Sequence, residues 1–136
     1  MISIISGEVV ERALLNSTLE KVSEAVAKNH RDTGKGCLIL ARPDYTFTVT
    51  PCEREPSLRE LQKMVAGPGQ DRGLIQPVDH YLGKDYSLNG KPSTAYANEE
   101  GLLIGCSINR LGAALVNWPE PLVGPIVILC GCFSNE

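Results

Sequence analysis

Aromatic residues are scarce in this 136-residue sequence, which contains two Phe, four Tyr and one Trp. Aliphatic side chains must therefore fill any hydrophobic core. The composition, with 43% hydrophobic and 21% charged residues, is that of a globular protein and not of a disordered one. Because the length is typical of one domain, we expect residues 1–136 to form a single domain.

Basic clusters and long apolar runs are also missing. The formal net charge is -3 at pH 7, and no run of Lys and Arg suggests a surface for nucleic acid. No segment reaches the roughly 18 apolar residues of a membrane helix. The N-terminus lacks the basic start and apolar stretch of a signal peptide. We therefore expect no nucleic-acid or membrane partner, and a cytoplasmic location.

The five cysteines are an odd number in a chain without a secretion signal, which predicts reduced thiols. Cys37, Cys106 and Cys130 lie in apolar runs and are expected in the core. Cys130 and Cys132 form a Cys-Gly-Cys sequence, but no second pair lies at zinc-finger spacing. We therefore expect no metal site.

Catalytic motifs are not found either. His80 is a candidate general base, but no serine elbow, HExxH motif or Cys-His arrangement accompanies it. The glycine-rich segment 67–73 lacks the Lys-Ser or Lys-Thr of a phosphate loop, and we interpret it as the end of a helix. We expect no catalytic residues, no cofactor and no enzymatic activity, with an uncharacterised hydrolase as an alternative.

Three segments have features of helices. Ser17 followed by Glu20 matches a capping box, so we predict that the first helix starts there and ends near Asn29. Residues 7–15 are either a strand or an early extension of this helix. The second helix begins after Ser57, and the third covers residues 107–117. The residues expected to face inward in these two helices are Leu58, Leu61, Met64, Val65, Ile108, Leu111 and Leu115.

Apolar and alternating runs predict strands at residues 2–5, 36–41, 45–51, 73–82, 93–97, 102–106 and 124–131. The last of these, GPIVILCG, is the best candidate for a central strand. The order of elements predicts an α+β fold, with an antiparallel or mixed sheet and two to three helices packed on one face. Few residues follow the last strand to cover it, so we also expect a homo-oligomer that buries apolar surface.

From about Cys37 to Gly131 the chain resembles the family named domain of unknown function 3846. The matching pieces are LILARPDYTFTVTP, SLRELQKMVAG, IQPVD, YANEEGLL, INRLGAALV and LVGPIVILCG, in the same order and at the same spacing. Such proteins are small and occur in phages, plasmids and bacterial genomes. The resemblance implies a mobile-element origin and an α+β core over residues 37–131. Residues 1–36 would then be an N-terminal strand and helix extension, and the resemblance implies no catalytic residues.

The segment NEEG, residues 98–101, has two interpretations. In the first it is a hairpin turn, in which Asn98 and Gly101 adopt turn conformations and the glutamates face water. In the second it is a ligand site, in which the carboxylates accept hydrogen bonds from a ribose or an amide, or bind a cation. Adjacent strand residues point to opposite faces, so Glu99 and Glu100 are not expected to act as a catalytic pair.

Asn109 and Arg110 begin the third predicted helix. A helix N-terminus offers free backbone donors and a partial positive charge to an anion, and Arg110 would add a fork for a phosphate. The alternative is a helix cap with a surface or interface ion pair, for example to Glu99 or Glu100. We expect the turn to bring Asn98 and one glutamate towards this helix. The candidate ligand-binding residues are therefore Asn98, Glu99, Glu100, Asn109 and Arg110.

These features predict a non-enzymatic accessory protein of a phage or mobile element that acts by binding. The leading hypothesis is counter-defence, in which the protein sequesters a small anionic ligand such as a signalling nucleotide. The alternative is a protein-interaction module that inhibits a host factor. In either case we expect it to act in the cytoplasm of the host cell.

Overall fold

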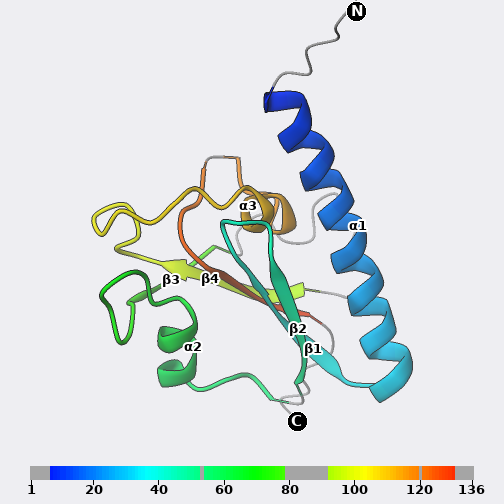
Figure 1. The fold of residues 1–136 in the computed structure, drawn as a ribbon. Helices are drawn as coiled ribbons and strands as arrows, with labels where there is room; N and C mark the ends of the chain where they lie inside the picture. The colour runs from blue at the N-terminus through cyan, green and yellow to red at the C-terminus, as the bar shows by residue number, and fades with distance from the viewer. Residues whose placement is uncertain (1–6, 53, 79–91, 120, 131–136) are drawn as a thin grey trace, which may run out of the picture.

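The computed structural model describes residues 7–52, 54–78, 92–119 and 121–130. Its helices are α1 (Gly7–Thr33), α2 (Leu58–Met64) and α3 (Arg110–Leu115). Its strands are β1 (Gly36–Ala41), β2 (Phe47–Cys52), β3 (Ile75–Pro77), β4 (Pro92–Asn98) and β5 (Ile126–Cys130). The strands form one sheet in the order β2-β1-β5-β4-β3, and each neighbouring pair is antiparallel (Figure 1). The α+β fold with an antiparallel sheet is therefore confirmed.

Strand β5 lies at the centre of this sheet, as the sequence predicted. It pairs with β1 on one side and with β4 on the other. All five of its residues are buried, because a central strand with helices on both sides meets no water. This explains why its sequence is a continuous apolar run without alternation.

Two hydrophobic clusters lie on opposite faces of the sheet. One cluster joins Ile126 and Ile128 of β5 to buried residues of α1 and α3. The other joins Val127 and Leu129 to Leu61 of α2. Two helices therefore share one face, as predicted, while α2 covers the other face, which would otherwise expose apolar side chains to water (Figure 1).

Helix α1 begins ten residues before the predicted start. Ser17 lies inside the helix and is not its cap, and Thr18 Oγ1 donates to the backbone oxygen of Leu14 at 2.7 Å. The helix runs to Thr33, past the predicted end near Asn29, and stops where Gly34 adopts a φ of 66°. Nothing in residues 7–15 breaks a helix, so the early extension is the correct alternative. The strand predicted for residues 2–5 lies outside the described residues.

Three other expectations need correction. Residues 102–106, predicted as a strand, form no strand, and residues 102–105 are consecutive turns. Leu58 and Ile108, predicted to face inward, are 59% and 51% exposed, since Leu58 starts α2 and Ile108 precedes α3. The strand predicted for residues 73–82 is limited to β3 within the described residues, and its end, including His80, lies outside them.

Candidate functional site

Asn98, the last residue of β4, is 4% exposed, and its side chain makes three hydrogen bonds. Its Nδ2 donates to the backbone oxygen of Val65 at 2.9 Å and to Gln70 Oε1 at 2.7 Å. Its Oδ1 accepts from the backbone nitrogen of Glu100 at 2.8 Å. Both amide hydrogens are therefore used within the protein. Asn98 fastens the end of α2 to the turn after β4, which is a structural role.

Gln70 extends this network to the turn. Its Nε2 donates to Glu100 Oε1 at 3.3 Å, and its Oε1 also accepts from the backbone nitrogen of Gly67 at 3.2 Å. Gly73 lets the chain approach closely, since a Cβ there would lie 2.5 Å from Asn98 Nδ2. Sequence reasoning missed Gln70 and Gly73 because their segment was interpreted only as a helix stop. The hydrogen-bond partners of Gln70 are 28 and 30 residues away in the sequence.

The NEEG segment forms a turn, as predicted, but not a hairpin, because no strand directly follows it and the chain continues as a loop to residue 106. The backbone nitrogens of Gly101, Ile104 and Cys106 donate to the backbone oxygens of Asn98, Glu100 and Gly101, at 3.2, 3.1 and 2.9 Å respectively. Gly101 is buried, and a Cβ there would lie 2.6 Å from Val123 Cγ2. The glycine is therefore required by close packing of this loop.

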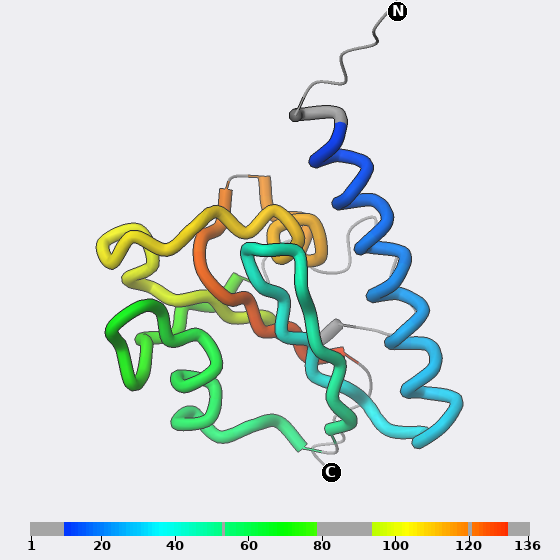
Figure 2. The backbone as a smooth tube through the Cα atoms, viewed as in Figure 1, coloured from blue at the N-terminus to red at the C-terminus, as the bar shows by residue number. Residues whose placement is uncertain are grey.

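Two leucines in the middle of this loop point into solvent. Leu102 is 82% exposed and Leu103 is 87% exposed, and we call this pair the apolar tip. Ile104 and Cys106 pack inward, so close to Gly67 that a Cβ there would lie 2.6 Å and 2.8 Å from their side chains. The loop, drawn in yellow, projects from the body of the protein on the side away from α1 (Figure 2).

Asn109 is fully buried and caps α3. Its Oδ1 accepts from the backbone nitrogen of Gly112 at 2.8 Å. Its Nδ2 donates to the backbone oxygens of Ala41 and Gly124, at 2.9 and 2.8 Å. The side chain therefore joins α3 to the end of β1 and to the segment before β5. Asn109 is therefore a helix cap, as the alternative interpretation predicted, and the side-chain amide of this candidate ligand-binding residue is fully used within the protein.

Arg110 lies on the surface and does not pair with the NEEG turn. Its side chain is 56% exposed, and Nη1 lies 3.6 Å from Glu11 Oε2 of α1. The ion pair suggested with Glu99 or Glu100 is therefore replaced by one with α1. Glu99 is exposed, and its backbone nitrogen donates to the backbone oxygen of Leu74 at 2.8 Å. The predicted site residues thus belong to two separate buried networks and to the surface.

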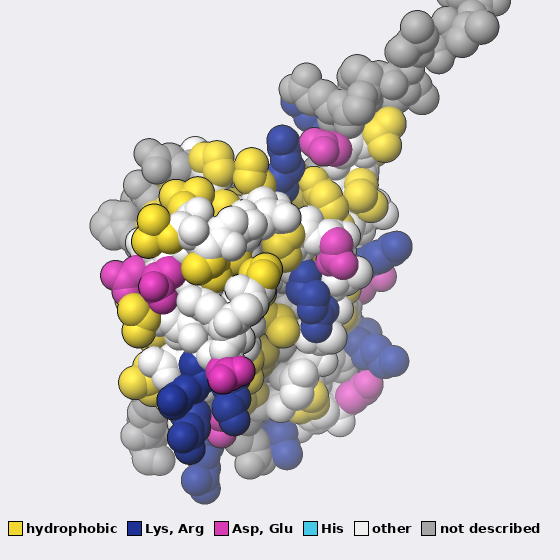
Figure 3. Space-filling view, turned by 60° about the vertical axis from the view of Figure 1, so that its left-hand side comes forward, with side chains coloured by type: hydrophobic (Ala, Val, Ile, Leu, Met, Phe, Trp, Pro, Cys, Tyr) yellow, Lys and Arg dark blue, Asp and Glu magenta, His cyan; other side chains and the backbone are white. Residues whose placement is uncertain are grey.

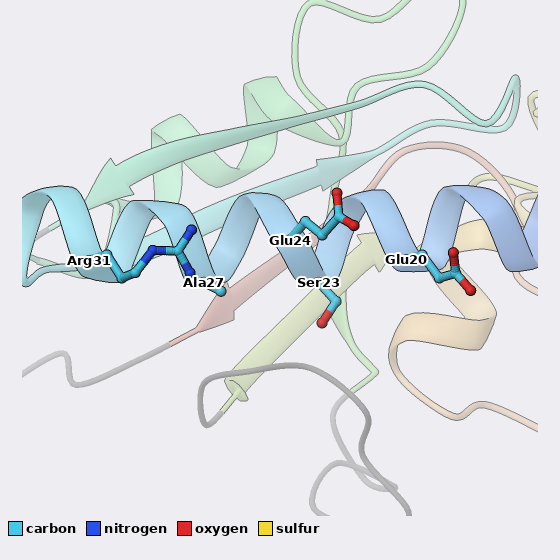
Figure 4. Close-up of a pocket in the computed structure, with 5 residues that line it drawn as sticks. All are labelled: Glu20, Ser23, Glu24, Ala27 and Arg31. Atoms are coloured by element: carbon cyan, nitrogen blue, oxygen red, sulfur yellow. The ribbon is translucent and has the colours of Figure 1, made fainter.

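A groove of about 390 Å³ lies along one side of α1. Figure 4 shows the residues that line it, which are Glu20, Ser23, Glu24, Ala27 and Arg31. They follow each other at helical spacing and combine acidic and basic side chains. None of the candidate ligand-binding residues lines this groove.

Metal binding and membrane insertion find no support in the part of the chain that the structure describes. Among these residues no group of three or more His, Cys, Asp and Glu could hold a metal ion. No described helix has both the length and the apolar character needed to cross a membrane. Burial raises the pKa of the Cys106 thiol, which keeps it protonated near neutral pH.

Comparison of the chain with protein families, with characterised proteins and with solved structures finds no match in any of the three. The resemblance to the domain of unknown function 3846 therefore stays a prediction from the sequence. Functional interpretation has to rest on the geometry of the described residues.

Proposed function

We propose that this protein acts by binding another protein, and that the apolar tip enters an apolar pocket on the partner. The observation that carries this proposal is the exposure of Leu102 and Leu103, at 82% and 87%. Burying two leucine side chains in a complex contributes about 1.5–3 kcal/mol each. Together they would contribute about 3–6 kcal/mol, compared with about 8 kcal/mol for a complex of micromolar affinity.

The tip is well prepared for binding because its loop is already ordered. Hydrogen bonds within residues 98–106 hold its backbone, and Asn98 and Gln70 anchor its base to the end of α2. A loop fixed before binding loses little conformational entropy in the complex. Leu14 of α1 is equally ordered but is only 46% exposed, so it offers less apolar surface to a partner.

Charge beside the tip indicates the chemistry of the partner. Glu99 is exposed and Glu100 is half-buried, and only Gly101 separates them from the leucines in the sequence. A pocket bordered by Lys or Arg would pair with these carboxylates, whereas an anionic membrane would repel them. Figure 3 shows a face where hydrophobic side chains gather in the upper part, with acidic side chains at its left edge and at several other places. We therefore infer a protein partner whose apolar pocket has a basic rim.

This proposal favours the protein-interaction alternative over sequestration of a small anion. Asn98 and Asn109 donate their amide hydrogens to groups inside the protein. Of these three side chains, Arg110 alone could still donate hydrogen bonds to a bound anion, and it lies near Glu11. An origin in a phage or mobile element, and inhibition of a host factor in the cytoplasm, remain part of the proposal through the family resemblance alone.

The experiment is a cross-linking comparison in cells that naturally carry the gene. A photoreactive amino acid replaces Leu103 in one variant and Leu14, a 46% exposed residue of α1, in a matched control. We expect a discrete cross-linked protein from position 103 that position 14 does not give. After purification, that protein should bind Leu102→Ser/Leu103→Ser more than about tenfold more weakly than the wild type, while Leu14→Ser binds normally.

Electrostatic steering supplies a second readout. Because Glu99 faces a basic rim in this proposal, Glu99→Lys should lower the association rate, and added salt should lower the wild-type rate. Equal cross-linking at positions 103 and 14, or tight binding of the double serine variant, would overturn the proposal. A cross-link to a second copy of this chain would also contradict it.

A further inference from the structure

Cys37 and Cys130 lie directly opposite each other on the neighbouring strands β1 and β5. The pairing of β1 with β5 places Cys37 beside Cys130, and both belong to the hydrophobic cluster under α1 and α3. Each is 1% exposed. Both side chains therefore lie on the same face of the sheet, in neighbouring strands, and both thiols are free.

We propose that Cys37 and Cys130 are a site of reversible oxidation, at which a low-molecular-weight disulfide such as oxidised glutathione converts the two thiols into one disulfide between β1 and β5. Directly opposed residues of antiparallel strands have Cα atoms about 4.5–5.5 Å apart. Disulfides span Cα separations of roughly 4.4–6.8 Å, so the bond requires little movement of the backbone.

The two thiols also contact each other. A hydrogen bond between them lowers the pKa of Cys37, although burial acts in the opposite direction. The same hydrogen bond raises the pKa of Cys130, and burial raises it further. Cys37 is therefore the better nucleophile of the pair and Cys130 the resolving thiol.

The reaction balances in two exchange steps. The Cys37 thiolate attacks one sulfur of oxidised glutathione, so a mixed disulfide forms as the glutathione S–S bond breaks and one glutathione leaves. Cys130 then loses its proton and attacks the sulfur of Cys37, which releases the second glutathione. The two cysteine protons end on the two glutathione thiols, and two electrons pass from the cysteines to the oxidant.

Access to this buried pair comes from the end of the sheet. Cys130 is the last residue of β5, and on its other side it pairs with Pro92. Proline has no backbone N–H to donate, and the β4–β5 register shifts between Pro92 and Thr94. The ladder is weakened at this point, so local opening of the end of β5 exposes the pair without unfolding of the sheet.

Cys52 and Cys106 serve as controls. Cys52 belongs to the opposite face of the sheet, and its Sγ donates to the backbone oxygen of Arg54. Cys106 lies in the loop beside Gly67. Neither lies opposite another described cysteine in the strand pairing, so replacing both should leave the reaction unchanged.

In the experiment, the full chain is equilibrated in a series of glutathione buffers from reducing to oxidising, starting separately from reduced and from oxidised protein. Free thiols are then trapped with iodoacetamide, and linked peptides are mapped by mass spectrometry. We expect a Cys37–Cys130 linkage that forms in the oxidising buffers, disappears with dithiothreitol, and persists in Cys52→Ser/Cys106→Ser. Cys37→Ala and Cys130→Ala, checked for folding by circular dichroism, should each abolish it.

Three results would overturn the inference. In the first, Cys37 and Cys130 stay fully alkylated in every buffer at equilibrium. In the second, only mixed disulfides with glutathione accumulate. In the third, the linkage maps to Cys132 in place of Cys130. Because the wild-type protein alone gives this answer, the result does not depend on whether the core variants fold.

Discussion

At the scale of single residues, Asn109 and Arg110 are neighbours in sequence with opposite environments. Asn109 is fully buried and makes three side-chain hydrogen bonds, whereas Arg110 is more than half exposed and makes a loose ion pair. Replacement of Asn109 would leave one buried donor and two buried acceptors without partners. Replacement of Arg110 removes only a contact that water and salt already weaken.

We therefore predict that Asn109→Ala lowers the free energy of unfolding by about 2–4 kcal/mol, because unpaired buried polar groups and a lost helix cap both destabilise the fold. Arg110→Ala should change it by less than about 1 kcal/mol. Urea unfolding followed by circular dichroism gives both values, with Glu11→Ala as the control for the ion pair. A loss of several kcal/mol in Arg110→Ala would show that the arginine is a structural clamp.

The sequence could identify Asn98 and Asn109 as candidate functional residues, but it could not predict their structural roles. Asn98 and Asn109 were selected because asparagine occurs at turns and helix starts, and both do lie there. What the sequence does not reveal is the partner of each amide. The side chain of Asn109 reaches Ala41, 68 residues earlier in the chain, and such a contact follows only from the completed sheet.

At the scale of elements, local patterns predicted the central part of the sheet. The runs at 36–41 and 124–131 were predicted from continuous apolar sequence, and they became neighbouring central strands. Helix α2 was predicted from Ser57, whose side chain accepts from the backbone nitrogen of Glu60 as expected. These patterns involve residues that are close in sequence, so they predict the elements without knowledge of the tertiary contacts.

Where elements pack was harder to predict. The apolar run LLIGC at 102–106 resembled a strand, yet the hydrogen bonds of its backbone close on residues 98–102 and its two leucines face solvent. The sequence also does not predict which face of the sheet α2 covers, because the apolar positions of a helix show that it packs but not against which face. The loop at 102–106 and the position of α2 both depend on contacts between residues that are distant in sequence, and hydrophobic periodicity gives no information about such contacts.

The central position of β5 leads to a second stability prediction. Ile128 is fully buried, lies opposite Ile39 of β1 and Ala95 of β4, and belongs to the cluster under α1 and α3. Ile128→Ala should lower the free energy of unfolding by about 2–5 kcal/mol, from lost burial and the cavity that remains. Chemical denaturation measures this, and Leu103→Ala is the matched exposed control. A loss below about 1 kcal/mol would place Ile128 outside the core.

At the scale of the whole molecule, the structure changes the argument about self-association. A homo-oligomer was expected because few residues follow β5 to cover it. The structure instead buries all five residues of β5 within one chain. The outer strands of the sheet are β2 and β3, and each contains a proline, Pro51 and Pro77. Proline on an edge strand removes a hydrogen-bond donor and discourages pairing with a second sheet.

The last prediction concerns the mass of the protein in solution. With the core closed and the edge strands protected, we expect light scattering at micromolar concentration to give a monomer of 14.7 kDa, for the wild type and for Leu102→Ser/Leu103→Ser alike. The apolar tip is small, so two copies that meet only there would bury too little surface for a stable dimer. A dimer in the wild type that the double variant abolishes would make a second copy the partner of the tip. A dimer in both proteins would restore the original expectation through a different surface.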